Sequence, residues 1–254
     1  MKLIALALML LTPSVWAGQL SSQTKGLYAL FHFNEGTGTI TKSAAGTWMG
    51  TGASTGTFVG TMAWGTGLWG KGLAAAGTNG YVDLGTGFAL DTSSSTVCAW
   101  IKPTYPPSSY TTGIDFLSKK SGSSTGAFQF MINQPSAGGA TFTVYGEYQS
   151  VGTKAGTQKY PANQWHMICY TYDRQFMRAF VDGVEDLTYR TAATAAVTDT
   201  TAVSAVIGRS MWTTYPSYFK GGIDELFVVN GRAMPGGELM RIYKLGYGVH
   251  MGRD

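Results

Sequence analysis

Charge is scarce in this sequence. Asp, Glu, Lys and Arg make up 13% of its 254 residues, about half of the roughly 25% found in an ordinary soluble domain. The 18 basic and 14 acidic residues leave a net charge of +4 without a basic cluster. Proteins that bind nucleic acid concentrate basic residues on one face. We therefore expect no nucleic-acid partner.

Long apolar runs and helical patterns are also scarce. The longest apolar run covers residues 3–11, and a transmembrane helix needs about 20 residues, so no membrane span is expected. The 35 glycines exclude a coiled coil. The apolar residues reach 44% and the aromatic residues 13%. This content is enough to build a core, which excludes intrinsic disorder.

The first 17 residues have the pattern of a signal peptide. Lys2 precedes the apolar run, and the small residues Val15 and Ala17 mark a cleavage site before Gly18. A buried N-terminal helix is the alternative. We predict an exported protein, extracellular or periplasmic, whose residues 18–254 form a single domain.

Short segments rich in β-branched and aromatic residues dominate the remaining sequence, with Gly, Pro, Asn and Asp between them. Residues 37–71 are rich in Gly and Thr, which favours short strands and tight turns; a disordered linker is the alternative. Residues 121–126 and Asp182-Gly183 lie between predicted strands, and Asp-Gly predicts a hairpin turn. Only residues 236–245 have a helical pattern, with Leu239, Ile242 and Tyr243 on one face. Many strands and one short helix predict an all-β sandwich or barrel. The other predicted strands are 27–33, 81–84, 96–102, 113–118, 127–132, 141–145, 165–172, 177–181, 205–207 and 223–229.

Segments 26–36, 64–73, 80–85, 96–103, 165–173, 180–183 and 219–226 together resemble a known family. Their order is similar to that of the laminin G-like and pentraxin branch of the concanavalin A-like lectin/glucanase superfamily. This resemblance implies an antiparallel β-sandwich jelly roll with adjacent first and last strands. The helical pattern adds a short C-terminal helix to that fold.

The two cysteines resemble the paired half-cystines of pentraxins, which lie in the corresponding strands. In an exported protein Cys98 and Cys169 are expected to form a disulfide, and two buried free thiols are the alternative. The cysteines lie 71 positions apart, so closing this loop would stabilise the fold by up to about 4 kcal/mol.

The pattern of carboxylates does not favour catalysis. Glucanases of this fold place two or three carboxylates on one strand, on either side of the glycosidic bond, whereas the acidic residues here are scattered. We predict that the protein is not an enzyme. A hydrolase or lyase that uses Glu147 or Asp224 is an alternative.

A structural calcium is the one cofactor that the resemblance suggests, because many bacterial laminin G-like modules carry one near their joined termini. Asn34, Glu35 and Asp224 would be its ligands, since calcium prefers carboxylate and amide oxygens. The alternative is that these side chains only make hydrogen bonds at turns.

Uncharged aromatic residues gather in residues 211–219. Carbohydrate recognition needs aromatic surfaces and a few polar partners, so this loop is the predicted ligand site. Alternatively, its rings cover a sheet edge or form a protein–protein contact. The predicted ligand-binding residues are Trp212, Tyr215, Tyr218 and Phe219, with Tyr145 and Tyr148 from another segment.

Together these features predict an exported, non-catalytic carbohydrate-binding or adhesive protein. Its partner would be an extracellular glycan or a surface polymer. The alternative function is a self-assembling structural subunit, such as a coat, filament or decoration component of a cell surface or virion-type particle.

Overall fold

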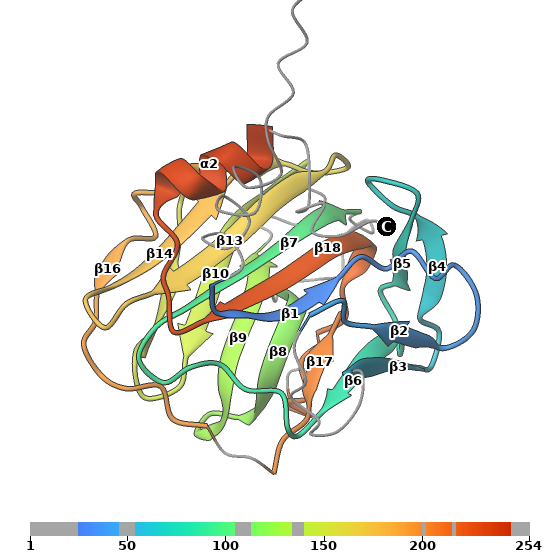
Figure 1. Ribbon diagram of the computed structural model, residues 1–254, viewed down its shortest axis with the longest axis horizontal. Helices are drawn as coiled ribbons and strands as arrows, with labels where there is room; N and C mark the ends of the chain where they lie inside the picture. Colours follow the sequence, from blue (N-terminus) through green and yellow to red (C-terminus); the bar gives the residue numbers. More distant parts are fainter. Residues whose placement is uncertain are drawn as a thin grey trace, which may run out of the picture.

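Two antiparallel β-sheets, stacked face to face, form most of the described chain (Figure 1). The computed structural model describes residues 25–45, 54–104, 113–133, 140–199, 202–214 and 217–244. The predicted signal peptide, residues 1–17, and Tyr215 lie outside these ranges. The sandwich confirms the predicted all-β jelly-roll fold.

The first sheet contains the first and the last strand of the described chain. Its strands are β1 (Leu27–Phe31), β4 (Ala63–Thr66), β5 (Lys71–Ala76), β7 (Ser95–Pro103), β13 (His166–Tyr172), β14 (Phe176–Val181), β15 (Val184–Glu185), β16 (Thr191–Ala192) and β18 (Lys220–Asn230). They follow the order β15-β14-β13-β7-β18-β5-β4, with β1 beside β18 and β16 beside β14. The pairing of β1 with β18 confirms that the first and last strands are adjacent.

The second sheet lies behind the first in Figure 1. Its strands are β2 (Ile40–Lys42), β3 (Thr55–Val59), β6 (Tyr81–Gly85), β8 (Ile114–Gly122), β9 (Thr125–Asn133), β10 (Thr141–Tyr148), β11 (Gly152–Ala155), β12 (Tyr160–Pro161) and β17 (Ala205–Ile207). They follow the order β11-β10-β9-β8-β17-β6-β3-β2, with β12 beside β10. The three long strands β8, β9 and β10 are therefore neighbours.

Aromatic side chains fill the space between the sheets. Phe130 on β9 stacks on Tyr170 of β13 with 4.9 Å between ring centroids, and Phe116 of β8 stacks on the same tyrosine at 6.0 Å. All three side chains are fully buried. Burying several aromatic rings supplies much of the apolar stabilisation of such a core.

Two turns show how local sequence shapes the strands. Asp182 and Gly183 both have positive φ, 54° and 79°, between β14 and β15, as the predicted Asp-Gly hairpin turn requires. Residues 121–126, expected as a longer connection, are instead the tip of the β8–β9 hairpin. Gly126 has a φ of 135°, and a Cβ there would lie 2.1 Å from the carbonyl oxygen of Lys119. Glycine therefore permits the bulged pairing that extends this hairpin.

The helix α2 (Gly236–Lys244) covers the outer face of the first sheet, over β13 and β14 (Figure 1). Leu239 and Ile242 are its buried residues, as the sequence pattern predicts. They belong to a second apolar cluster that also includes Phe180 and the disulfide cysteines. No helix in the described ranges combines the length and the hydropathy that a membrane crossing requires.

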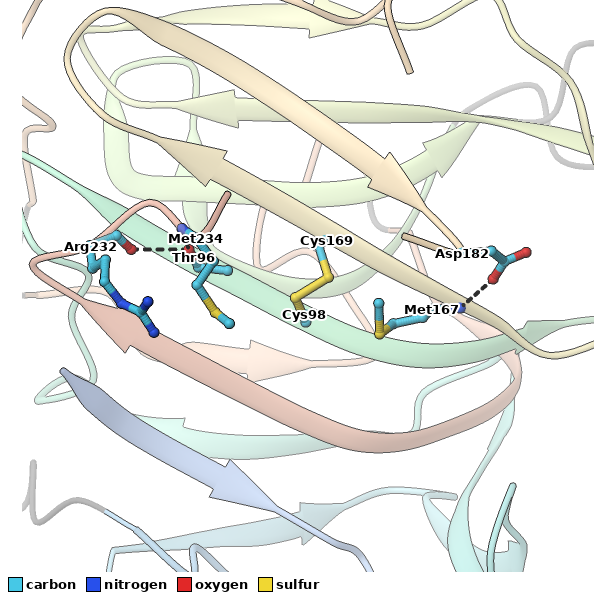
Figure 2. Close-up of a disulfide and its surroundings, with 7 residues drawn as sticks. All are labelled: Thr96, Cys98, Met167, Cys169, Asp182, Arg232 and Met234. Atoms are coloured by element: carbon cyan, nitrogen blue, oxygen red, sulfur yellow. Dashed lines mark hydrogen bonds between the residues drawn. A yellow bond between two sulfur atoms is a disulfide. The ribbon is translucent and has the colours of Figure 1, made fainter. Parts of the chain in front are cut away.

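The predicted disulfide joins neighbouring strands of the first sheet (Figure 2), and its cysteines pack in the same cluster as the buried residues of α2. Cys98 on β7 lies directly opposite Cys169 on β13, with their Cα atoms 4.1 Å apart. Nearby, the hydroxyl of Thr96 donates to the carbonyl oxygen of Arg232 and accepts from the backbone N–H of Met234, at 3.0 and 2.8 Å. These bonds hold the segment leading to α2 against β7.

Candidate ligand-binding site

A pocket of about 230 Å³ opens on the outer face of the second sheet, and we call it the Trp212 pocket. Side chains alternate between the two faces of a strand. On β9, Phe128, Phe130 and Ile132 enter the core, so the residues between them face outward. The residues that line the pocket are Gly113, Gln129, Met131, Asn133, Tyr145, Trp212 and Ser217.

The pairing of β9 with β10 places Tyr145 at this pocket. Tyr145 lies opposite Met131, and Glu147 lies opposite Gln129. The backbone N–H of Tyr145 donates to the phenol oxygen of Tyr170, which donates to the carbonyl oxygen of Met131, at 3.2 and 2.9 Å. A buried phenol of the first sheet therefore holds the two strands together under the pocket.

Trp212 comes from the loop of residues 208–219, which joins β17 to β18. The N–H of Ser210 donates to the carbonyl oxygen of Ser217 at 3.0 Å, and Arg209 pairs with Tyr218. The hydroxyl of Ser210 accepts from the N–H of Trp212 at 3.1 Å. These contacts close the base of the loop and direct it over β8 to β10.

Polar side chains lie beside and beneath this pocket. The Lys120 ammonium lies 5.2 Å from the centroid of the Trp212 ring and forms an ion pair with Glu147. Asp115 is fully buried, and its Oδ2 accepts a hydrogen bond from the hydroxyl of Ser217. Its Oδ1 accepts no hydrogen bond of good geometry from the described residues.

Burial changes the acid–base properties of two groups at this site. Burial raises the pKa of Asp115 to about 7, although the hydrogen bond from Ser217, the nearby amide of Gln129 and the charge of Lys120 oppose the increase. Burial and the charge of Glu147 also raise the pKa of Tyr145 above its usual value. The phenol of Tyr145 is therefore neutral at pH 7 and can donate a hydrogen bond.

The raised pKa of Asp115 predicts a pH-dependent stability. The folded protein holds this proton more tightly than the unfolded chain, in which the pKa of an Asp is about 3.9. The free energy of unfolding should therefore increase, by on the order of 2 kcal/mol, as the pH falls from about 8 to 5. Urea titrations across this range should show the increase. Asp115→Asn should make it smaller and leave the part due to Asp224, whose pKa burial also raises to about 7. An equal increase in the Asp115→Asn variant would contradict this assignment.

The structure brings together some of the predicted aromatic residues and separates others. Trp212 and Tyr145 line one pocket, although they lie 67 positions apart (212 − 145). Tyr218 is half-buried, and the Arg209 guanidinium stacks on its ring at 4.8 Å. Tyr215 lies outside the described residues.

Tyr148 and Phe219 require a correction as predicted ligand residues. Their exposed fractions are 1% and 0%, and both belong to the core between the sheets. Tyr148 lies three positions after Tyr145 on β10, so alternation turns its ring to the opposite face, where it packs against Phe130. Neither ring can stack on a ligand at the surface.

Sequence analysis overlooked the polar side chains of this site. Gln129 and Asn133 lie four positions apart among the apolar residues of β9. On β8, Asp115 directly precedes the apolar residues Phe116 and Leu117. Polar residues on one face of an otherwise apolar strand indicate an outward face with partners. These polar residues were the signal in the sequence that could have located the site. The sequence could not show that the 208–219 loop lies above it.

The predicted calcium ligands all accept hydrogen bonds from backbone N–H groups. Asn34 accepts from the N–H of Lys71 at 3.1 Å, and Asp224 accepts from the N–H of Leu68 at 2.8 Å. Glu35 accepts from the N–H of Lys42, the last residue of β2, at 2.7 Å. The described residues contain no group of three His, Cys, Asp or Glu side chains arranged to hold a metal. A structural calcium at Asn34, Glu35 and Asp224 stays a prediction.

Comparison of the sequence with protein families identifies one match. A laminin G family model, described as the concanavalin A-like lectin/glucanases superfamily, matches residues 76–239. This range includes β6 to β18 and the first turn of α2. No curated protein matches the sequence.

Solved structures share the fold at low sequence identity. Domain 4 of AbnA, an extracellular GH43 arabinanase from Geobacillus stearothermophilus in complex with arabinotriose, is 20% identical with a TM-score of 0.62, over 85% of this chain and 98% of that domain. Botulinum neurotoxin type C is 9% identical with a TM-score of 0.60, over 90% of this chain and 53% of the neurotoxin chain. Trypanosoma rangeli sialidase is 13% identical with a TM-score of 0.57, over 86% of this chain and 32% of the sialidase chain. The chain thus spans about half of the neurotoxin chain and a third of the sialidase.

Proposed function

Because the chain belongs to the laminin G family of the concanavalin A-like lectin/glucanase superfamily, we propose that it is an exported, non-catalytic protein that binds a glycan in the Trp212 pocket. The observation that carries this proposal is the meeting of Trp212 and Tyr145 at one pocket. Export is supported by the disulfide, since such bonds persist mainly outside the cytoplasm.

The pocket combines the two chemistries that sugar recognition needs. The rings of Trp212 and Tyr145 offer apolar surfaces to the apolar face of a sugar ring, and aromatic side chains with a polar tip suit such interfaces. The amides of Gln129 and Asn133 can both donate to and accept from hydroxyl groups. The volume of about 230 Å³ lies below the usual 300–1,000 Å³ of ligand pockets, which favours one sugar residue of a longer chain.

The charges around this pocket favour a neutral glycan. Lys120 is paired with Glu147, and the raised pKa of Asp115 keeps a large part of that carboxyl protonated at pH 7. The described residues that line the pocket are themselves uncharged, so the lining offers no positive charge to an acidic sugar. A neutral sugar can instead donate its hydroxyl groups to the amide oxygens of Gln129 and Asn133.

Two of the structural neighbours support this proposal because each interacts with a sugar-containing molecule. The arabinanase domain was solved in complex with arabinotriose, and cell entry of the neurotoxin depends on interaction with two ganglioside molecules. These proteins share only the fold with this chain. They support glycan binding as a function that such a sandwich can carry.

Removing the indole of Trp212 should abolish most of the binding. Trp212→Ala should weaken the affinity for a neutral oligosaccharide by at least about 30-fold, the range typical of a buried aromatic anchor. A panel of immobilised neutral oligosaccharides that includes arabinotriose should identify a ligand, and calorimetry with that ligand should measure the change. Tyr145→Ala should act in the same direction.

Phe176→Ala is the matched control, because Phe176 is a half-buried aromatic residue on β14 of the other sheet. It should leave the affinity unchanged. Binding that survives Trp212→Ala, or the absence of binding across the panel, would contradict the proposed site. Release of shorter sugars from the bound oligosaccharide would contradict its non-catalytic character.

The alternative function, assembly as a structural subunit of a surface or particle, stays a prediction. No observation on the described residues favours it over glycan binding.

A further inference from the structure

A second concave site lies on the other layer of the sandwich. This hollow of about 320 Å³ is on the outer face of the first sheet, over β5, β18 and β7, and we call it the Trp165 hollow. The neighbouring residues Leu73, Ile101 and Ile223 enter the core. By strand alternation, Ala74, Lys102 and Gly222 face outward.

The hollow exists because side chains are missing along one row of the sheet. Gly222 on β18 lies between Ala74 on β5 and Lys102 on β7. A Cβ at Gly222 would come within 2.6 Å of the Trp165 ring, so glycine lets the indole approach the backbone. Trp165 precedes β13 and is half-buried. Its ring therefore forms an aromatic wall beside an open stretch of sheet.

Two lysines border this hollow without a countercharge. Lys102 is exposed on β7, and Lys220 lies two positions before Gly222 on β18, so both face outward. The N–H of Thr104 donates to the carbonyl oxygen of Lys220 at 2.8 Å, which fixes the backbone at this edge. In the described part of the chain neither lysine forms an ion pair, and no carboxylate lines the hollow.

The two buried lysines of β8 differ in this respect. Lys119 and Lys120 on β8 are both paired, with Asp199 and Glu147 respectively. Lys102 lies opposite Gly222, two positions after Lys220 on β18, so the two lysines are diagonal neighbours on one face of the sheet and one bound anion could contact both. Ammonium groups form short, charge-assisted hydrogen bonds with carboxylate or sulfate oxygens. The unpaired lysines thus indicate an anionic ligand.

We propose that the Trp165 hollow is a second binding site, which takes an acidic sugar residue of a polysaccharide. The sugar ring would lie against the Trp165 indole, and its carboxylate or sulfate would lie between Lys102 and Lys220. The aromatic wall beside the two cations favours a ring that carries the charge over a bare inorganic anion, which has no apolar face. This site lies on the opposite sheet from the Trp212 pocket and does not depend on the function proposed there.

Two acidic probes test the proposal and separate the two anionic groups. Oligogalacturonate presents carboxylates, and heparin-derived oligosaccharides present sulfates; maltohexaose is the neutral reference. Calorimetry should detect at least one acidic probe binding more tightly than maltohexaose. The double variant Lys102→Gln with Lys220→Gln should weaken that binding at least tenfold, as expected for the loss of two charged hydrogen-bond partners.

The matched control removes the same charge elsewhere. Lys42 and Lys154 do not line the hollow, so Lys42→Gln with Lys154→Gln should leave the affinity for the acidic probe within about twofold. An equal loss in both double variants would indicate non-specific attraction to a basic protein and would overturn the proposal. Failure of both acidic probes to bind, or equally tight binding of sodium sulfate alone, would also overturn it.

Two further variants separate this site from the Trp212 pocket. Gly222→Ala should displace the indole and weaken binding of the acidic probe, while thermal melting checks that the variant is folded. Trp212→Ala should leave that binding unchanged. Loss of the acidic probe in Trp212→Ala, with retention in the Lys102 and Lys220 double variant, would place the ligand in the other pocket and refute the second site.

Discussion

Replacing Lys119 with methionine should lower the free energy of unfolding by about 3–5 kcal/mol, because removing one member of a buried ion pair leaves its partners unsatisfied. The Lys119 side chain is fully buried. Its Nζ donates to the carbonyl oxygens of Thr86 and Phe88 and to the carboxylate of Asp199, each at 2.9 Å. This single ammonium therefore holds the segment after β6 and the segment before β17 against β8.

Urea denaturation measures this effect, and two further variants give it a reference. Lys159→Met changes an exposed lysine and should alter stability by no more than about 0.5 kcal/mol. Combining Lys119→Met with Asp199→Asn should restore part of the loss, since the uncompensated carboxylate is then removed. A Lys119→Met protein within about 1 kcal/mol of the natural protein would show that the buried ammonium does not organise these segments.

Removal of the Cys98–Cys169 disulfide should have the second largest effect on stability. The cross-link closes a loop over a sequence separation of 71, and the chain-entropy argument assigns about 4 kcal/mol to such a loop. The cysteines (Figure 2) also pack in the cluster that includes the buried residues of α2. We expect Cys98→Ala with Cys169→Ala to cost about 2–4 kcal/mol and to lower Tm by roughly 5–15 °C.

Thermal and urea unfolding with and without a reducing agent provide the control for this prediction. The reductant should destabilise the natural protein and leave the double variant unchanged. If the variant and the oxidised natural protein unfold at the same urea concentration, the disulfide does not contribute to the stability of the fold.

Local sequence patterns predicted most of the fold. The alternation of β-branched and aromatic residues located the long strands, because one side of each strand must enter the core. The pattern of Leu239 and Ile242 located the buried face of α2, and Asp182-Gly183 predicted a turn that needs positive φ. The resemblance supplied what these patterns cannot show, namely that β1 and β18 are paired and which strands carry the disulfide.

The candidate site was only partly predictable, because its residues come from segments that are distant in sequence. Composition located the aromatic 208–219 loop and selected Tyr145. It could not separate Tyr145 from Tyr148. Side chains alternate between the two faces of β10, so Tyr145 faces the pocket and Tyr148 faces the core. Composition does not show which face of the strand is buried. Asp115 was missed because its partner Ser217 lies 102 positions away in sequence.

The sequence by itself determined the class of fold, the positions of most strands, the short helix and the low content of charged residues. These properties depend on the spacing of side chains along the chain, which is a local quantity. The tertiary structure alone decided that Trp212 meets Tyr145, and that Ala74, Gly222 and Lys102 form one row beside Trp165. Such sites arise from pairing between distant strands, and strand pairing is set by burial of the whole core, not by any single segment.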